Sequence, residues 1–239
     1  METPFSLRMT ADILPQIDIP TGPFNPAVAW EHQYAMWIVV TGPSGKSHQA
    51  GTLTLTRTCG PAPRLDVDQT THLTGQRSLR TWGSTNISGN RLSTPLSWRL
   101  ESQLFLQANA LPETHVEISG QWRAGTVSLH SSSNKRVLKT NRQMSACWTL
   151  FDAVQRLGTL AAPVRFDLLE EMELLRPGHL LTTAEPAEAR INGQTVPLRR
   201  YEQTGAGILP TTYWLDAYDR LIMVYAGVRA FILTAGGNR

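Results

Sequence analysis

The sequence predicts a mainly β protein, built on an antiparallel sheet with one packed α-helix at about residues 145–157. Three observations lead to this fold class. Apolar and polar residues alternate along several segments with the two-residue period of a half-buried strand. One segment alone shows a strong 3.6-residue period, which is typical of an amphipathic helix. Charged residues make up 17% of the chain, below the usual ~25%, and so little charge argues against a disordered chain.

Composition and charge exclude several functional classes. The 239 residues contain no run of ~18 apolar residues, so we expect no transmembrane segment. The net charge is only +3, and the single basic cluster (Lys135, Arg136, Lys139 and Arg142) follows a serine-rich segment that indicates a solvated loop. We therefore expect no nucleic-acid partner. No signal peptide is visible, which predicts a cytoplasmic protein, or a periplasmic or envelope protein if a leader was removed.

The two cysteines leave two alternatives open. Cys59 and Cys147 are far apart, and neither belongs to a Cys-x-x-Cys motif or a zinc-spaced cluster. They are either two separate buried thiols or one long-range disulfide. The six histidines form no metal-ligand motif, and Asp66-Val-Asp68 alone makes a poor cation site. The sequence therefore predicts no metal site and no cofactor.

The chain divides into a proline-rich N-terminal arm, residues 1–29, and a single antiparallel β domain, residues 30–235. Five prolines fall within the first 26 residues, and proline interrupts both helices and central strands. The arm also carries apolar residues such as Phe5, Ile13 and Phe24. Because these side chains would otherwise lie in water, we expect the arm to pack against the domain.

Alternation identifies the strands of the β domain. It is clear from Trp30 to Val40 and clearest from Leu96 to Gln107, where leucine and tryptophan alternate with polar side chains. A Gly-Pro-Ser-Gly sequence at 42–45 predicts a hairpin turn into a Thr/Leu strand at 52–56. Lys46 and Ser47 follow it, but Val40 stands where a phosphate-binding loop needs glycine, so we interpret 42–47 as a turn.

The predicted helix begins after Ser145, a residue type that caps helices, and stops at Gly158. Its apolar stripe consists of Cys147, Leu150, Phe151, Val154 and Leu157. Trp148 and Asp152 lie off this stripe. A helix with one apolar face needs a partner surface, and we expect that surface to be the inner face of the sheet.

The segment 166–175 is compatible with a strand or a helix, and we favour a strand followed by a turn at Arg-Pro-Gly-His, residues 176–179. Asn192-Gly193 is a strong hairpin signal. Residues 212–215 and 221–225 predict a second hairpin around 216–220, and 228–233 predicts the last strand.

The C-terminal third resembles uncharacterised bacterial envelope proteins. In these a late β-meander carries a Pro-Thr … Trp-Leu/Val-Asp-x-x-Gly-Arg-Leu pattern, which here reads from Pro210-Thr-Thr-Tyr-Trp-Leu-Asp216 to Arg220-Leu221. Asp219 replaces the usual glycine, and Asp enters the left-handed region more easily than most residues. The resemblance implies a curved antiparallel sheet or open half-barrel, of the lipoprotein-carrier type, wrapped around a helix. It implies no catalytic residue.

Glu170 is the main candidate site residue. On a strand it would share a face with Phe166, Leu168, Met172 and Leu174, where an unpaired carboxylate is unfavourable. Its candidate partners are Arg99, Arg199 and Arg229, with Arg199 and Arg229 preferred. This pair serves either structure or ligand binding. Trp37, which lies on the polar face of its strand, either packs against the arm or offers a stacking platform for a ligand.

Three functions remain open. The first is a non-catalytic protein that binds an apolar or sugar-like ligand on the curved sheet. The second is an accessory subunit that binds a protein partner through the arm and the aromatic face around Trp37. The third is a hydrolase or lyase that uses Glu170 with a nearby arginine or histidine. A concave apolar pocket would favour the first function, and convergent titratable groups in a cleft would favour the third.

Overall fold

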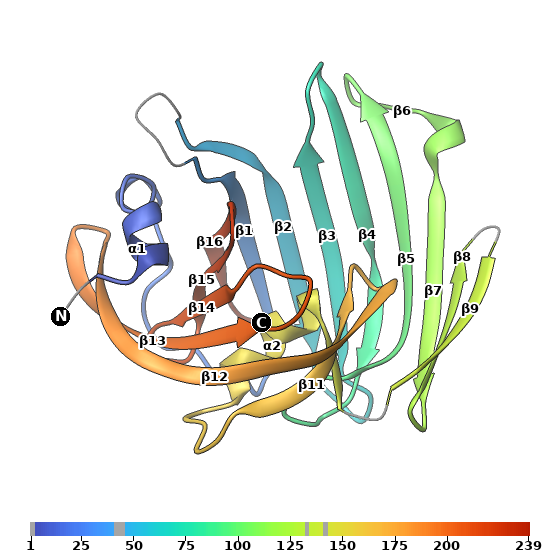
Figure 1. The fold of residues 1–239 in the computed structure, drawn as a ribbon. Helices are drawn as coiled ribbons and strands as arrows, with labels where there is room; N and C mark the ends of the chain where they lie inside the picture. The colour runs from blue at the N-terminus through green and yellow to red at the C-terminus, as the bar shows by residue number, and fades with distance from the viewer. Residues whose placement is uncertain (1–2, 41–45, 132–133, 141–142) are drawn as a thin grey trace.

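One continuous β-sheet forms most of the molecule in the computed structural model, which describes residues 3–40, 46–131, 134–140 and 143–239. Its strands follow the order β10-β11-β12-β13-β14-β15-β16-β1-β2-β3-β4-β5-β7-β8-β9, with the short β6 paired to β5. All strand pairs are antiparallel except β10 with β11. The predicted mainly β fold with a curved, unclosed antiparallel sheet is confirmed (Figure 1).

The strands of the first half are β1 (Trp30–Ile38), β2 (His48–Thr58), β3 (Arg64–His72), β4 (Arg77–Ile87), β5 (Pro95–Leu106), β6 (Asn109–Ala110), β7 (Val116–Arg123) and β8 (Thr126–Ser131). Those of the second half are β9 (Asn134–Lys139), β10 (Met144–Ala146), β11 (Val164–Glu170), β12 (Leu174–Ile191), β13 (Gln194–Thr204), β14 (Thr211–Leu215), β15 (Leu221–Ala226) and β16 (Arg229–Asn238). The helical elements are α1 (Phe5–Met9), η1 (Leu14–Gln16), η2 (Pro112–Thr114) and α2 (Cys147–Arg156).

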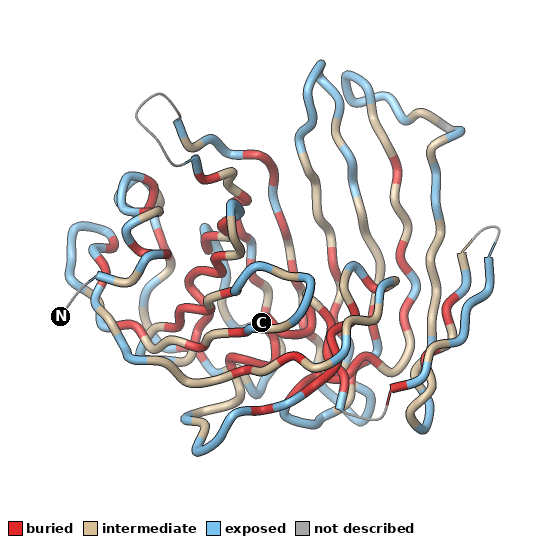
Figure 2. The backbone as a smooth tube through the Cα atoms, in the orientation of Figure 1, coloured by how far each residue is buried: buried red, intermediate tan, exposed pale blue. Residues whose placement is uncertain are grey.

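The sheet curls until its edge strand β10 meets the segment that leads into β5. The Thr94 hydroxyl donates to the carbonyl of Met144 at 2.5 Å, and the Ser145 hydroxyl donates to the carbonyl of Leu92 at 2.8 Å. Strands β11–β16 and β1–β5 thus surround α2. Strands β7–β9 continue beyond this contact as an extension of the sheet. Figure 2 shows the buried backbone gathered around α2, whereas the far ends of β3, β4 and β5 are exposed.

The helix is buried on all sides, and not along one stripe. Trp148 and Asp152, which lie off the apolar stripe, are also buried, and Asp152 is as fully buried as Leu150 and Val154. The reason is that the curved sheet wraps around α2, as the resemblance of the C-terminal third implied, so that residues outside the apolar stripe also meet its inner face. The N-cap also differs from the prediction. It is Ala146, whose amide donates to the Thr149 hydroxyl at 2.9 Å, whereas the Ser145 hydroxyl donates to the carbonyl of Leu92.

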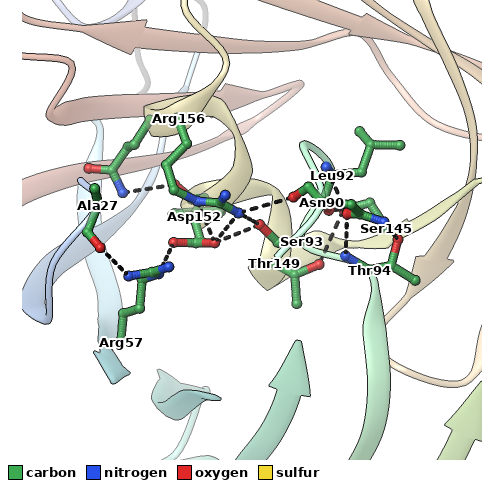
Figure 3. Close-up of polar contacts among 12 residues, drawn as sticks. Ala27, Arg57, Asn90, Leu92, Ser93, Thr94, Ser145, Thr149, Asp152 and Arg156 are labelled. Carbon is green, nitrogen blue, oxygen red and sulfur yellow. Dashed lines mark hydrogen bonds and ion pairs between the residues drawn. The ribbon is translucent and has the colours of Figure 1, made fainter. Parts of the chain in front are cut away.

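A buried ion network fixes α2 to the sheet (Figure 3). Asp152 is fully buried, and its carboxylate lies 2.8 Å from Arg57 of β2 and 2.8 Å from Arg156 of α2. The Ser93 hydroxyl donates to the same carboxylate at 2.5 Å. Arg57 also donates to the carbonyls of Ala27 and Val28, at 3.3 and 3.2 Å. One carboxylate therefore joins the helix, the strand β2 and the loop before β5.

The start of the N-terminal segment contacts the face of the sheet opposite α2, whereas Phe24 packs against His32 on the inner face. The indole N–H of Trp214 donates to the Ser6 hydroxyl at 3.0 Å, and the ring of Phe5 meets that of Tyr225 edge-on at 6.1 Å. Asn192, at the tip of the β12–β13 hairpin, exchanges two hydrogen bonds with the backbone of Ile19. Residues of this segment, including Leu7, Ile13, Leu14, Ile19 and Phe24, belong to the main apolar core. Arg220 donates to the carbonyls of Pro20 and Gly22.

Two predicted hairpins are observed where the sequence placed them. Asn192 and Gly193 link β12 to β13 with φ values of 49° and 76°. Asp219 adopts φ 65°, the left-handed conformation expected of the residue that replaces glycine in the 216–220 turn. The last strand is longer than predicted and runs to Asn238. The predicted turn at 42–45 lies outside the described residues.

The predicted turn at 176–179 and the predicted basic loop are both wrong. The chain reverses earlier, at residues 171–173, where Glu171 and Met172 both adopt left-handed φ values of 48° and 60°. β12 then continues through Pro177. The register between β11 and β12 shifts opposite this residue, between Phe166 and Leu168, so the proline interrupts no hydrogen bond between the two strands. The basic residues from Lys135 to Lys139 form the edge strand β9, and Arg142 lies outside the described residues. Both cysteines are free thiols.

Candidate functional site

A cavity of about 380 Å³ lies between the start of α2 and one end of the surrounding strands. Its inner wall is aromatic: Trp148 and Phe151 come from α2, Tyr213 from β14 and Phe231 from β16. The register explains this wall, because Tyr213, Val224 and Phe231 are direct neighbours on β14, β15 and β16 and therefore share the inward face. The ring of Phe151 meets those of Phe231 and Tyr213 edge-on, at 5.7 and 6.5 Å.

Several polar groups in and behind the inner wall bind one another. The Tyr213 hydroxyl donates to the amide oxygen of Gln203 at 2.6 Å, and the Gln203 side chain contacts Nδ1 of His179 at 3.2 Å. Trp148 donates its indole N–H to Gln69 of β3 at 3.2 Å. Burial, with the charge of Arg176, lowers the pKa of His179, and burial raises the pKa of Tyr213 well above its ordinary value. These groups are therefore neutral at pH 7 and satisfy much of one another's hydrogen bonding.

Cys147 brings a thiol to the cavity wall at the first turn of α2. Burial, together with the nearby carboxylates of Glu170 and Glu171, raises its pKa to about 11. The thiol thus stays protonated at neutral pH. Since the thiolate is the reactive form of cysteine, this side chain is a weak nucleophile.

Glu170 lines the cavity, but its surroundings differ from the prediction. The turn at 171–173 ends β11 directly after Glu170, so Met172 and Leu174 do not continue its face. Its partner is Arg176 of the neighbouring strand, whose Nε lies 2.6 Å from the carboxylate. Both side chains are 29% exposed. The pair therefore forms at the rim of the cavity and leaves no carboxylate buried in an apolar face.

The other predicted site residues divide between two places. Arg229 lines the cavity together with Glu170. Arg199 instead forms an ion pair with Asp219 at 2.5 Å and lies over the ring of Tyr201. Arg99 of β5 pairs with Glu117 of β7 at the surface, away from the cavity.

Trp37 lies in the cross-strand row of Ala230 and Tyr225, on the face that contacts α1. This is the face opposite the cavity. Its place agrees with packing against the N-terminal segment and not with a stacking platform beside the cavity.

Sequence reasoning missed the aromatic wall. Tyr213 and Phe231 lie in segments that it recognised as strands, and Trp148 lies in the recognised helix. The signal was the alternation that places Tyr213, Val224 and Phe231 at inward positions. Alternation alone does not show that these residues are neighbours. That requires knowing that β14, β15 and β16 pair with one another in this order.

No group of three or more histidine, cysteine or acidic side chains that could hold a metal ion occurs among the described residues. In the same part of the chain, none of the helices has the length and apolar character needed to cross a bilayer.

The fold and the cavity define a β-barrel-like protein whose open, curled sheet surrounds a helix. One solved structure with this fold is a β-barrel-like protein with the domain of unknown function DUF1849 from Brucella abortus. The alignment covers 88% of this chain and 98% of that protein, with a TM-score of 0.59 and 10% sequence identity. At this identity the similarity concerns the fold. No protein-family model and no curated protein matches the sequence.

Proposed function

We propose that this protein is a non-catalytic binding protein that holds a small, mainly apolar ligand in the cavity between α2 and strands β11 and β13–β16. The observation that carries the proposal is the cavity itself: it is concave, about 380 Å³ in volume, and lined by aromatic and aliphatic side chains. Ligand sites typically have volumes of about 300–1,000 Å³ and walls of this kind, with few polar groups.

The state of the polar groups supports binding over catalysis. Glu170 is held by Arg176, the Cys147 thiol is protonated, and Tyr213, Gln203 and His179 form a neutral chain. A general base or nucleophile needs a group poised to take a proton or attack at neutral pH. The same polar chain favours an apolar ligand over a sugar, because Tyr213 and Gln203 on the inner wall already hydrogen-bond each other and offer a sugar few free groups there.

The accessory-subunit function receives less support from this arrangement. The apolar residues of the N-terminal segment, which would have met a partner, contact the protein itself: Leu7 and Ile13 belong to its core, and Phe5 meets Tyr225. A location in a bacterial envelope rests on the Pro210–Leu221 resemblance alone.

Binding of N-phenyl-1-naphthylamine, an uncharged probe that fluoresces in apolar sites, tests the proposal. The test variant is Ala226→Phe, which places a ring in the cavity from β15, where Ala226 is one of the lining residues. Ala235→Phe is the matched control, because Ala235 is exposed on β16 and does not line the cavity.

We expect the wild type and Ala235→Phe to bind the probe with equal affinity, and Ala226→Phe to bind at least roughly tenfold more weakly. Circular dichroism and the melting temperature confirm that both variants are folded. The proposal is wrong if the wild type does not bind the probe, or if folded Ala226→Phe binds it as well as the control does.

A further inference from the structure

The mouth of the cavity combines exposed apolar side chains with one cation. Leu209 and Val228 line the cavity and are nevertheless 62% and 57% exposed. Arg229 follows Val228 directly and lines the same mouth. Among the described lining residues, Arg229 is the one basic side chain.

The backbone at Arg229 is fixed by its neighbours in the fold. It is the first residue of β16, directly after the tight turn that links β15 to β16, where Gly227 adopts φ 65°. The carbonyl of Val228 accepts a hydrogen bond from the amide of Val39 at 2.8 Å, which ties the turn to the end of β1. A Cβ at Gly227 would lie 2.3 Å from Leu209, so the loop before β14 packs closely on this turn.

The guanidinium of Arg229 has no ion-pair or hydrogen-bond partner among the described residues. Other arginines around the barrel do have such partners: Arg176 binds Glu170 and Arg199 binds Asp219. An arginine offers five donors in a planar fork that matches a carboxylate or a phosphate. Arg229 therefore presents an unused anion-binding group beside an apolar cavity.

The acidic residues of the rim come from a different element. Glu170 and Glu171 line the cavity from the end of β11 and the turn that follows it. Their charges disfavour an anion on that side, and Arg229 favours one beside the β15–β16 turn. A ligand with an apolar chain and an anionic end is thus favoured with its charged end beside Arg229, away from Glu170 and Glu171.

We propose that the ligand is an amphiphile with an anionic headgroup, whose chain fills the aromatic cavity and whose head binds Arg229. Leu209 and Val228 contact the part of the chain nearest the head. This inference rests on the proposed function and adds the chemical class of the ligand. The headgroup is a carboxylate, as in a fatty acid, or a phosphate, as in an anionic phospholipid.

Displacement of N-phenyl-1-naphthylamine by three amphiphiles of equal chain length tests the headgroup: dodecanoate, dodecanol and dodecylammonium, each kept below its micellar concentration or, for dodecanol, below its solubility limit. A second arm measures cosedimentation with vesicles of phosphatidylglycerol or of phosphatidylcholine. The variants are Arg229→Gln and Arg229→Lys. Arg190→Gln is the matched control, because Arg190 is an exposed arginine next to a hairpin turn and does not line the cavity.

We expect the wild type to prefer dodecanoate over dodecanol by roughly tenfold or more, as a hydrogen bond to a charged group provides. Arg229→Gln should bring the ratio of the two affinities close to one. Arg229→Lys should retain part of the preference, and Arg190→Gln should retain all of it. Added salt should weaken the binding of dodecanoate and leave that of dodecanol unchanged. A preference for phosphatidylglycerol over phosphatidylcholine vesicles that is lost in Arg229→Gln would identify an anionic phospholipid as the source of the headgroup. This result would support the same inference.

The inference is wrong if the probe binds in the cavity but the wild type prefers the anionic member in neither arm. It is also wrong if the preference survives in Arg229→Gln. Both outcomes leave the binding function intact. Failure of the uncharged probe to bind is the separate result that would overturn the proposed function itself.

Discussion

Replacing Asp152 by asparagine removes the charge at the centre of the buried network of Figure 3 while keeping its shape. The carboxylate is fully buried and lies 2.8 Å from both Arg57 and Arg156. The side chain of Arg156 is 16% exposed and can turn towards water once the carboxylate is lost. The side chain of Arg57 is only 7% exposed, so its charge stays buried with the backbone carbonyls of Ala27 and Val28 as partners.

The expected loss follows from this stranded cation. Removing one partner of a buried ion pair lowers the free energy of unfolding by about 3–5 kcal/mol. Arg57→Met should lower it by less, about 1–3 kcal/mol, because Asp152 then keeps Arg156 and Ser93. The double variant strands no cation, so its loss should fall short of the sum of the two single losses by about 1–3 kcal/mol.

Equilibrium unfolding in urea, followed by tryptophan fluorescence and circular dichroism, measures these values. An unchanged dependence on urea concentration would show that the denatured state is the same in each variant. Asp68→Asn is the matched control, because Asp68 pairs with Arg80 on the surface, where both side chains are nearly half exposed. It should lose less than about 1 kcal/mol. A loss of this small size for Asp152→Asn, or additive single losses, would refute the assigned role of the network.

Three further predictions concern the core, the pH dependence and the N-terminal segment. Phe151→Ala should lower the free energy of unfolding by about 3–5 kcal/mol in urea titrations, because the buried ring contacts three other aromatic rings. A loss below about 1 kcal/mol would mean that α2 is not part of the core. Burial, with the charge of Arg220, lowers the pKa of His32 from 6.5 to about 3. Below pH 6.5 the unfolded chain therefore binds a proton that the folded protein does not bind. The free energy of unfolding should fall as the pH drops from 6.5 towards 3, by about 4–5 kcal/mol in total. His32→Gln should flatten this part of the pH profile, apart from the contribution of His179 in the same direction, whereas the exposed His72→Gln should not. Deleting residues 1–29 should lower the melting temperature, and rapid proteolysis to a fragment starting near Trp30 with no change in melting temperature would contradict the docking of this segment.

Local patterns were sufficient for the elements with a clear period or a specific turn chemistry. Alternation identified β1 and β5, the apolar stripe and Gly158 located α2, and Asn192-Gly193 located a hairpin. These features depend on residues a few positions apart, so the sequence expresses them directly. Strands β3 and β4 were missed because both carry many polar, half-exposed residues, which makes their alternation correspondingly weak.

The candidate site depended on contacts that no local pattern contains. The sequence selected Glu170 and Arg229, and the fold brings both to one cavity, but the partner of Glu170 is Arg176. That pairing follows from a turn in which two non-glycine residues adopt left-handed conformations, which residue preferences alone argue against. The aromatic wall and the burial of Asp152 require the sheet to curl until β10 meets the segment before β5. The sequence by itself thus determined which residues share a face within a regular strand, because side-chain alternation is a local property. The tertiary structure alone decided which inward residues meet, because strand order and sheet curvature arise from contacts between residues far apart in the chain.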